Sequence, residues 1–298
     1  MKIIIAHLAR GIGALQRRAH DVATRPVVAI AATASLETAL GKLNEHKVGA
    51  LAITDNGGAL LGLVTERDVL LKTGLGHMTF RSVLEQPIAA FMTPLDDTTR
   101  ATPDSTLDQC LQKMLATDGR HMPVLDASGR LESMLSLRDV CCAVIAGGEL
   151  ESTTSVGEAL YFSDQRVGSI TEVSATSVVA DAVIQMRSRG TSSVLVPLAQ
   201  RTIAEGCVSY GIFTERDYAQ RALTSGVADV RYAPLHDFIT MPPALISVER
   251  GLPVVEALAI LAREKIRHVP VVAEATEATR PHLLGVLSMR ELIAHLFT

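Results

Sequence analysis

Apolar runs and helically spaced apolar positions alternate along this chain in an order that recurs. An apolar run at 26–30 precedes the sequence LETALGKL, whose apolar residues fall at helical spacing and predict a helix over 36–45. Two further apolar runs, at 49–53 and 60–64, are separated by Asp-Asn-Gly-Gly, a sequence that suits a tight turn. The second run leads into another helix that begins near Thr65. The pattern predicts a β-α-β-β-α unit with a three-stranded sheet and two helices.

The same unit is predicted four times, because two sequence phrases recur in the same order. The helical phrase reads LETALGKL, LDQCLQKM, VADAVIQM and VVEALAIL in successive copies. The strand-to-helix phrase reads GLVTERD, MLSLRD, GIFTERD and GVLSMRE, each time with a hydroxyl three residues before an acid. Polar insertions at 200–210 and 274–282 lengthen copies three and four, and we expect them to form longer hairpin loops. We therefore predict a mixed α/β (α+β) protein of four β-α-β-β-α repeats.

The four copies are of two kinds, which indicates how they are paired. Copies two and four carry Arg-His-x-Pro-Val on the middle strand, whereas copies one and three share Thr-Glu-Arg-Asp at the helix start. This alternation predicts two pseudo-symmetric pairs, because one unit is too small to bury both faces of its sheet. The predicted boundaries are an N-terminal helix or extension at 1–20, pair 1 at 21–147 (repeats at about 21–75 and 88–147), a linker at 148–163, and pair 2 at 164–298 (repeats at about 164–225 and 235–298).

Composition narrows the classes of partner. Hydrophobic residues make up 48% of the chain and aromatic residues only 3%, so we expect a core packed mainly from aliphatic side chains. The net charge of −4 and the few aromatic residues argue against a nucleic-acid partner, which needs basic and stacking surfaces. No apolar stretch is long enough to cross a bilayer, so we expect no membrane partner and a cytoplasmic location.

Sequence motifs of catalysis are not found. The chain has no nucleophile elbow, no phosphate-binding lysine loop and no dinucleotide-binding glycine pattern. Its cysteines, Cys110, Cys141, Cys142 and Cys207, lack the spacing of metal ligands, and we expect buried thiols. Because the repeats account for nearly the whole chain, we predict no enzyme activity and no metal site.

The recurring phrases resemble those of the cystathionine β-synthase (CBS) domain family over nearly the whole chain. The resemblance is carried by Gly-apolar-apolar-Thr/Ser-x-x-Asp after a hairpin and by Arg-His-x-Pro-Val on the middle strand. It implies that two repeats form a pair called a Bateman module, whose cleft binds an adenosine-type ligand and which regulates an attached or partner protein. It also implies that two such modules can join as one flat disc, either within one chain or in a homodimer.

The hydroxyl–acid pairs have two interpretations. In one, Thr65 and Asp68 only cap their helix, since a hydroxyl at the N-cap and an acid three residues later satisfy free backbone N–H groups. In the other, the helix start binds phosphate or ribose, with the carboxylate accepting from the ribose hydroxyls. The resemblance implies a ribose contact for Asp68, Asp139 and Asp217, whereas Glu291 departs from the family's Asp. The candidate nucleotide-binding residues are Thr65, Arg67, Asp68, Arg120, His121, Ser136, Arg138, Asp139, Thr214, Arg216, Asp217, Arg267, His268, Ser288 and Arg290.

These residues favour a regulatory, non-catalytic sensor of adenine nucleotides (AMP, ADP or ATP, with or without Mg²⁺) that requires no cofactor. The Arg-His pairs resemble the family's phosphate contacts and occur only in copies two and four, so we expect one better phosphate site in each pair. Ligand would bias the orientation of paired repeats, and an unidentified partner protein would respond. Two alternatives stay open: a structural or interaction protein of the same fold without a ligand, and a binder of S-adenosylmethionine or NAD.

Overall fold

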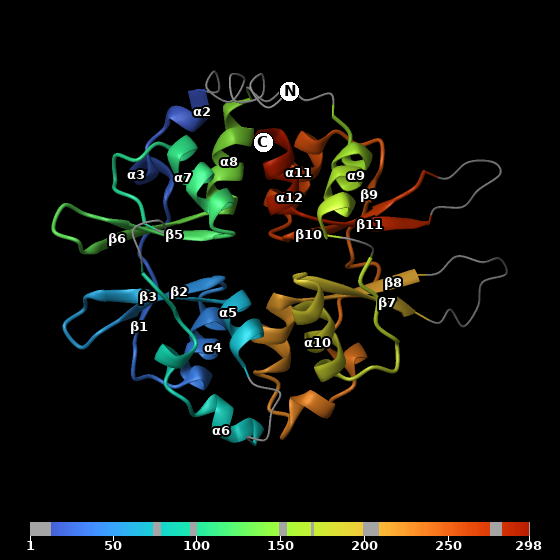
Figure 1. The fold of residues 1–298 in the computed structure, drawn as a ribbon, viewed down its shortest axis with the longest axis horizontal. Helices are drawn as coiled ribbons and strands as arrows, with labels where there is room; N and C mark the ends of the chain where they lie inside the picture. Colours follow the sequence, from blue (N-terminus) through green and yellow to red (C-terminus); the bar gives the residue numbers. More distant parts are fainter. Residues whose placement is uncertain are drawn as a thin grey trace. The chain divides into compact units, whose positions relative to one another are not determined.

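The computed structural model of this chain describes residues 13–73, 79–95, 100–148, 154–167, 170–198, 209–274 and 282–297. Packing divides the chain into two units, each assembled from separate segments. Unit 1 comprises Met1–Val27, Asp96–Gly168 and Ser247–Thr298, and unit 2 comprises Val28–Leu95 and Ser169–Ile246. Unit 1 therefore contains the second and fourth repeats, and unit 2 contains the first and third (Figure 1).

The first repeat shows why these residues form the predicted elements. Helix α4 (Leu36–Glu45) begins after Ser35, whose hydroxyl caps it, and buries one apolar face. Strands β2 (Ala50–Thr54) and β3 (Leu60–Thr65) pair antiparallel. In the turn between them, Asp55 Oδ1 accepts two backbone N–H groups at 2.9 and 2.8 Å. The predicted order of helix, hairpin and second helix is confirmed in this repeat.

Unit 2 combines the first repeat with the third. Its elements are β1 (Ala29–Ala31), α4, β2, β3, α5 (Glu66–Lys72), α6 (Phe80–Leu84), η1 (Ile88–Ala90), β4 (Thr93–Pro94), α10 (Val179–Arg189), β7 (Ser193–Leu198), β8 (Ser209–Thr214), η2 (Asp217–Ala222), η3 (Val230–Tyr232) and η4 (Leu235–Asp237). The larger sheet has the order β1-β2-β3-β4, with β1 parallel to β2, while β7 and β8 form an antiparallel hairpin. Helices α4 and α5 pack against η2, a π-helical segment of the third repeat.

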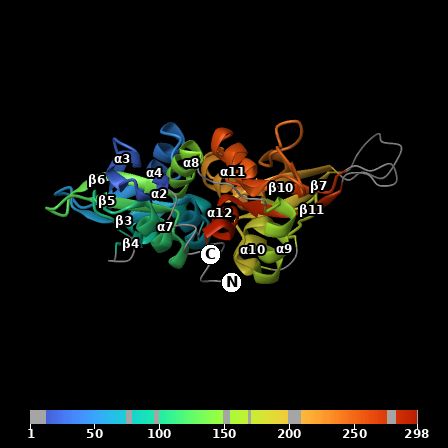
Figure 2. The same cartoon turned by 90° about the horizontal axis from the view of Figure 1, so that it is seen from above.

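Unit 1 combines the second repeat with the fourth. Its elements are α2 (Gly13–Gln16), α3 (Ala19–Val22), α7 (Leu107–Ala116), β5 (His121–Leu125), β6 (Leu131–Ser136), α8 (Leu137–Gly147), α9 (Val156–Val167), β9 (Val248–Glu249), α11 (Val254–Arg263), β10 (His268–Val272), β11 (Leu283–Ser288) and α12 (Met289–Phe297). Strands β5 and β6 form a hairpin, and the second sheet has the order β11-β10-β9. Helix α8 of the second repeat packs against α11 and α12 of the fourth (Figures 1 and 2).

Each unit has its own hydrophobic core, built mainly from aliphatic side chains as the composition predicts. In unit 1 the buried residues come from helices and strands of both repeats, with Leu111 and Leu261 of the helices fully buried. In unit 2 they include Leu40 and Phe213, which are likewise fully buried. Two repeats therefore share one core through their helices, which explains why neither repeat needs to be stable alone.

The two units differ from the predicted pairs. Each unit joins one repeat of 21–147 with one repeat of 164–298, because helices of repeats of the same kind bury their apolar faces against each other. The association of the first repeat with the second, and of the third with the fourth, stays a prediction.

The structure describes helices in the segments predicted to lie outside the repeats. The predicted linker at 148–163 contains the start of α9, in which Val156, Ala159 and Leu160 are buried at helical spacing. Within the predicted extension at 1–20, a helix is described over Gly13–Gln16, and residues 1–12 lie outside the described residues. The insertions predicted as long hairpin loops follow β7 and β10, but residues 199–208 and 275–281 also lie outside the described part.

The cysteines are only partly as predicted. Cys110 and Cys141 are buried, and burial raises the pKa of the Cys110 thiol to about 11. Cys142 is exposed, so the expectation of a buried thiol is wrong there. Cys207 lies outside the described residues.

Candidate functional site

The hydroxyl–acid pair of the first repeat caps its helix. Asp68 Oδ2 accepts from the backbone N–H and the hydroxyl of Thr65 at 2.9 and 2.6 Å, and Asp68 N donates back to Thr65 Oγ1 at 3.2 Å. This reciprocal arrangement satisfies the first free N–H groups of α5. The capping interpretation is confirmed, and it uses only one of the two carboxylate oxygens.

The other repeats repeat this geometry. In the second, Asp139 Oδ2 accepts from Ser136 N and Oγ at 2.8 and 2.7 Å. In the third, Asp217 Oδ2 accepts from Thr214 N and Oγ1 at 2.9 and 2.7 Å. In the fourth, the longer Glu291 accepts from Ser288 N at 2.7 Å through Oε2. Every motif acid is thus fixed at a helix start by one carboxylate oxygen. The second carboxylate oxygen, called the outer oxygen below, is not used by the cap and can accept from another donor.

The outer oxygen of Asp68 is used by the protein itself. Thr93 of β4 donates its hydroxyl to Asp68 Oδ1 at 2.5 Å, and Lys72 Nζ lies 3.3 Å from the same oxygen. The Lys72 ammonium also donates to the carbonyls of Phe91 and Met92 at 3.0 and 2.6 Å, which ties α5 to the segment before β4. A hydroxyl and a cation therefore occupy the position at which a ribose is predicted to bind.

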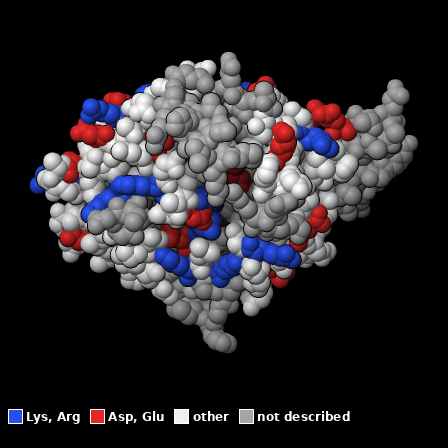
Figure 3. Space-filling model, turned by 45° about the horizontal axis from the view of Figure 1, so that its top comes forward, with Lys and Arg blue, Asp and Glu red and all other residues white. Residues whose placement is uncertain are grey.

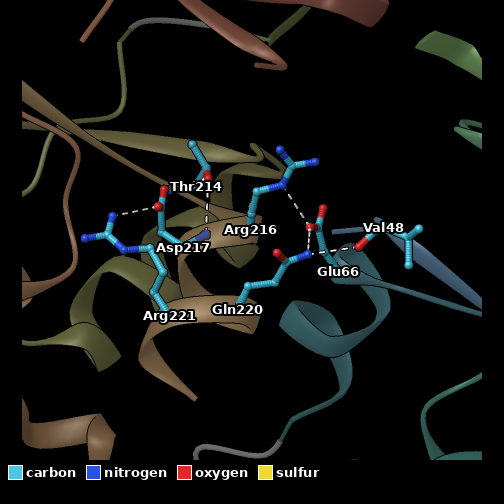
Figure 4. Close-up of polar contacts among 7 residues, drawn as sticks. All are labelled: Val48, Glu66, Thr214, Arg216, Asp217, Gln220 and Arg221. Atoms are coloured by element: carbon cyan, nitrogen blue, oxygen red, sulfur yellow. Dashed lines mark hydrogen bonds and ion pairs between the residues drawn. The ribbon is translucent and has the colours of Figure 1, made fainter. Parts of the chain in front are cut away.

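The outer oxygen of Asp217 is paired with a cation as well. Arg221, one helical turn later, donates to Asp217 Oδ1 at 2.9 Å (Figure 4). Asp217 itself is 7% exposed, so this arginine compensates a nearly buried charge.

Asp139 differs from both. At the position of Lys72 and Arg221, four residues after the acid, the second repeat has Ala143. Among the residues that the structure describes, none donates a hydrogen bond to Asp139 Oδ1. Burial raises the pKa of the Asp139 carboxyl, and this effect outweighs the hydrogen bonds from Ser136 and the charge of Arg138.

The Arg-His pairs lie next to the motif hydroxyls. His121 is the first residue of β5 and is paired across the hairpin with Ser136, and His268 of β10 is paired in the same way with Ser288. Arg120 and Arg267 directly precede these histidines, and all four side chains are half-buried. The structure thus brings the predicted basic pair and the hydroxyl–acid pair together within the second repeat and within the fourth.

The motif arginines of unit 2 pair with buried glutamates of the opposite repeat. Arg216 Nε lies 3.1 Å from Glu66 Oε1, and Gln220 Nε2 donates to the same oxygen at 2.7 Å (Figure 4). Arg67 Nη1 lies 3.7 Å from Glu215 Oε1, which is the symmetric contact. Glu66 is 0% and Glu215 2% exposed. These arginines therefore link two repeats, a role that the motif sequence alone does not indicate.

The motif arginines of unit 1 also contact the opposite repeat, but there they donate to carbonyls at the C-terminal ends of helices. Arg138 Nη2 donates to the carbonyl of Ala262 near the end of α11 at 2.8 Å. Arg290 Nη2 donates to the carbonyl of Leu115 near the end of α7 at 2.7 Å, and its Nε lies 2.9 Å from Asp118. Cations at helix C-termini oppose the helix dipole and satisfy free carbonyls. Each of the four motif arginines thus has a protein partner, and the nucleotide contact expected for them stays a prediction.

The residues that contact the outer oxygens of Asp68 and Asp217 were not among the predicted site residues. The cations at Lys72 and Arg221 were readable from the sequence, because residues four apart on a helix are neighbours. The Thr93 hydroxyl was not, because only the pairing of β3 with β4 brings it to Asp68.

We expect the substitutions Asp139→Asn and Asp68→Asn to change stability in opposite directions at pH 7. The amide oxygen can keep the cap in both variants. Asp139→Asn removes a partly buried charge and should raise the free energy of unfolding, whereas Asp68→Asn loses the Lys72 ion pair and should lower it by about 1–2 kcal/mol. Urea unfolding of both variants and the wild type measures the difference.

The pH dependence follows from the direction of the Asp139 pKa. A carboxyl whose pKa is raised on folding contributes stability at low pH, and this contribution is lost as the pH rises through the folded pKa. The advantage of Asp139→Asn over the wild type should therefore shrink as the pH is lowered toward 4. An equal loss of stability in both variants at pH 7 would contradict the different environments of the two acids.

The face drawn in Figure 3 has Lys and Arg side chains interspersed with Asp and Glu.

In the described residues, no group of three or more His, Cys, Asp or Glu side chains is placed to hold a metal ion. None of the helices in the described ranges is long and apolar enough to span a membrane.

Comparison with known proteins gives the family. The CBS domain model matches residues 19–72, 88–146 and 235–298, which is more than half of the chain. The CBS domain-containing protein CBSCBSPB1 of Arabidopsis thaliana is 22% identical over 272 residues, covering 81% of this chain and 48% of that protein. A 17.7 kDa protein of Acidianus ambivalens is 26% identical over 125 residues, covering 42% of this chain and 71% of that one. This chain spans about half the length of the Arabidopsis relatives it matches.

Solved structures agree on the fold. Protein MJ1225 from Methanocaldococcus jannaschii, proposed as an archaeal homologue of g-AMPK, superposes with a TM-score of 0.74 at 16% identity, over 94% of this chain and 99% of that one. A conserved protein of Pyrococcus horikoshii gives 0.56 at 16% identity, over 94% and 100%. The third repeat lies outside the family-model matches, and the structure supplies it through α10, β7, β8 and η2. With four repeats of one mixed α/β fold and a family model that covers most of three of them, this protein belongs to the CBS domain family.

Proposed function

We propose that this CBS-domain protein is a regulatory, non-catalytic sensor that binds an adenosine-type nucleotide. The observation that carries the proposal is the geometry of the motif acids. Each motif Asp uses Oδ2 in its helix cap. In the first repeat the outer oxygen of Asp68 accepts a hydrogen bond from the Thr93 hydroxyl at 2.5 Å. A ribose presents hydroxyl groups of the same kind, so an outer oxygen fixed in this way can accept them with little loss of side-chain freedom.

The basic pairs supply the second half of the proposed ligand contact. His121 lies across the hairpin from Ser136, on the same repeat as Asp139. A ligand whose ribose is bound at Asp139 would therefore have Arg120 and His121 within the same repeat for its phosphates. Mg²⁺ would come with a triphosphate ligand, since the proposal needs no protein-held metal.

The proposed signal is a change in how repeats are oriented. A ligand shifts such an equilibrium only by its difference in affinity for the two arrangements. A partner protein in the cytoplasm, where we expect this chain to act, would bind one arrangement better than the other.

A ligand panel tests the proposal. At 1 mM AMP, ADP, ATP, S-adenosylmethionine or NAD, at least one should raise the melting temperature of the wild type. A ligand present at about 100 times its Kd adds about 2.7 kcal/mol to the free energy of unfolding. The triple variant Asp68→Asn, Asp139→Asn and Asp217→Asn should lose this shift. Asp181→Asn should keep it, because Asp181 also caps a helix, α10, but outside the motif.

A structural or interaction protein without a ligand is the second candidate. It is favoured by the completeness of the caps and by the protein contacts that each motif arginine makes. Absence of stabilisation by every member of the panel would leave this candidate and exclude the sensor.

A further inference from the structure

The three motif aspartates are unequal in what surrounds their outer oxygens. Thr93 and Lys72 contact Asp68 Oδ1, and Arg221 contacts Asp217 Oδ1. Among the described residues, Asp139 Oδ1 has neither a hydroxyl nor a cation of this kind. The difference is built into the sequence, since Ala143 stands where the other two repeats have a basic residue.

A second position also differs between the first repeat and the second. The β3 residue Gly62 is paired with Pro94, and a Cβ added there would collide with the backbone carbonyl of Thr93. The glycine thus permits the close approach that lets Thr93 reach Asp68. The second repeat has Ser133 at the same point of its hairpin, three residues before Ser136, so it carries a side chain where the first repeat has none.

Thr24 is the counterpart of Thr93 in the second repeat. It pairs antiparallel with Met134, through hydrogen bonds of 2.8 and 3.2 Å, as Thr93 pairs with Leu63. Its hydroxyl has no hydrogen-bond partner within the described residues, and the side chain is exposed. Where the first repeat has a hydroxyl bonded to its acid, the second therefore has a hydroxyl at the corresponding strand position and a carboxylate oxygen that are not bonded to each other.

Buried polar atoms of the second repeat point to a missing partner. Ser133 is 0% exposed and its Oγ makes no hydrogen bond with any described residue. The Nε of Arg138, next to Asp139, is buried and likewise unbonded within the described ranges. Buried polar groups of folded proteins are usually satisfied, so an unbonded atom of this kind is consistent with a water or ligand as its partner.

We propose that Asp139 is the ribose-accepting carboxylate of this chain, and that the first and third repeats are closed by their own donors. The proposal rests on the proposed function and narrows it to one site. Only the second repeat joins an Asp at the motif position, an Arg-His pair and an alanine four residues after the acid. The fourth repeat has the basic pair but carries Glu291, whose longer side chain places the outer oxygen elsewhere.

Calorimetric titration of the full chain with AMP, ATP and S-adenosylmethionine, each separately, tests the site. We expect one ligand per chain for the wild type. Asp139→Asn should weaken the affinity about 10- to 100-fold, because the outward amide donates where a hydroxyl needs an acceptor. The control Asp181→Asn should bind as the wild type does. Ser133→Gly should weaken binding several-fold, because Thr24 can then approach Asp139 as Thr93 approaches Asp68.

The outcomes separate this inference from the proposed function. Binding by the wild type that survives Asp139→Asn but is weakened by Asp68→Asn or Asp217→Asn would overturn the assignment and leave the sensor intact. Two or more ligands per wild-type chain would also overturn it. No heat of binding and no thermal shift with any ligand of the panel would instead remove the proposed function itself.

Discussion

Replacing Arg216 with Ala is expected to lower the free energy of unfolding by about 2–3 kcal/mol. Glu66 is fully buried, and it accepts from Arg216 Nε at 3.1 Å and from Gln220 Nε2 at 2.7 Å. Removing the Arg216 guanidinium leaves the buried Glu66 carboxylate without its cation, with the neutral Gln220 amide still donating to it. The estimate is below the value for a fully buried pair because the Arg216 side chain is 38% exposed. Urea unfolding measures the loss, and hydrogen exchange should place it in unit 2.

The matched variant Glu66→Leu should cost much less, under about 1 kcal/mol, because replacing a buried charge with an apolar side chain removes its desolvation cost. The sequence supports this choice, since the second repeat carries Leu137 at the same position and buries it. Equal losses in Arg216→Ala and Glu66→Leu would show that packing, rather than the unpaired carboxylate, determines the effect.

Replacing Gly62 with Ala is expected to destabilise the chain by about 1–3 kcal/mol. The new Cβ would collide with the backbone carbonyl of Thr93, and a backbone carbonyl cannot rotate away as a side chain can. Strand β4 must therefore move outward, and the Thr93 hydroxyl should lose its 2.5 Å contact with Asp68. Unfolding experiments measure the destabilisation.

Gly41 is the control for this substitution. It lies inside α4, and a Cβ added there meets nothing within 4 Å. Gly41→Ala should therefore raise the free energy of unfolding by about 0.5–1 kcal/mol, through the lower entropy of the unfolded chain. If Gly62→Ala were as well tolerated as Gly41→Ala, the close approach of β4 to β3 would not explain the contact of Thr93 with Asp68.

Much of the local structure was predictable, because it depends on short-range pattern. The helix expected over 36–45 is found at Leu36–Glu45, and the hairpin expected around Asp55 is found between β2 and β3. The capping of a helix by Thr65 and Asp68 was also predictable, since both residues lie within one turn. Helix α9 begins within the segment predicted as a linker, and the apolar spacing of Val156, Ala159 and Leu160 that goes with it was already present in the sequence.

The packing of repeats into units depends on distant residues. The two kinds of repeat were visible in the sequence, and the pairs predicted along the chain stay a prediction. Packing joins repeats of the same kind, since the motif arginines and helix faces of each kind complement one another. In unit 2 the contacts are Arg67 with Glu215 and Arg216 with Glu66, and in unit 1 the arginines cap helices of the opposite repeat. Residues more than 100 positions apart carry these contacts, and no local pattern specifies them.

Residues only a few positions apart specify the repeat, its β-α-β-β-α order, the capped helix starts and the acid at each of them, so these features follow from local sequence alone. The tertiary fold, in contrast, selects which repeats share a core and which acids keep an outer oxygen for another donor. The shared cores depend on contacts between distant helices, and the state of Asp68 depends on a hydroxyl from β4 and on the space left by a missing Cβ at Gly62. Such contacts form when segments that are distant in the sequence pack together. The motif that Asp68 and Asp139 share therefore does not reveal that their outer oxygens differ in hydrogen bonding.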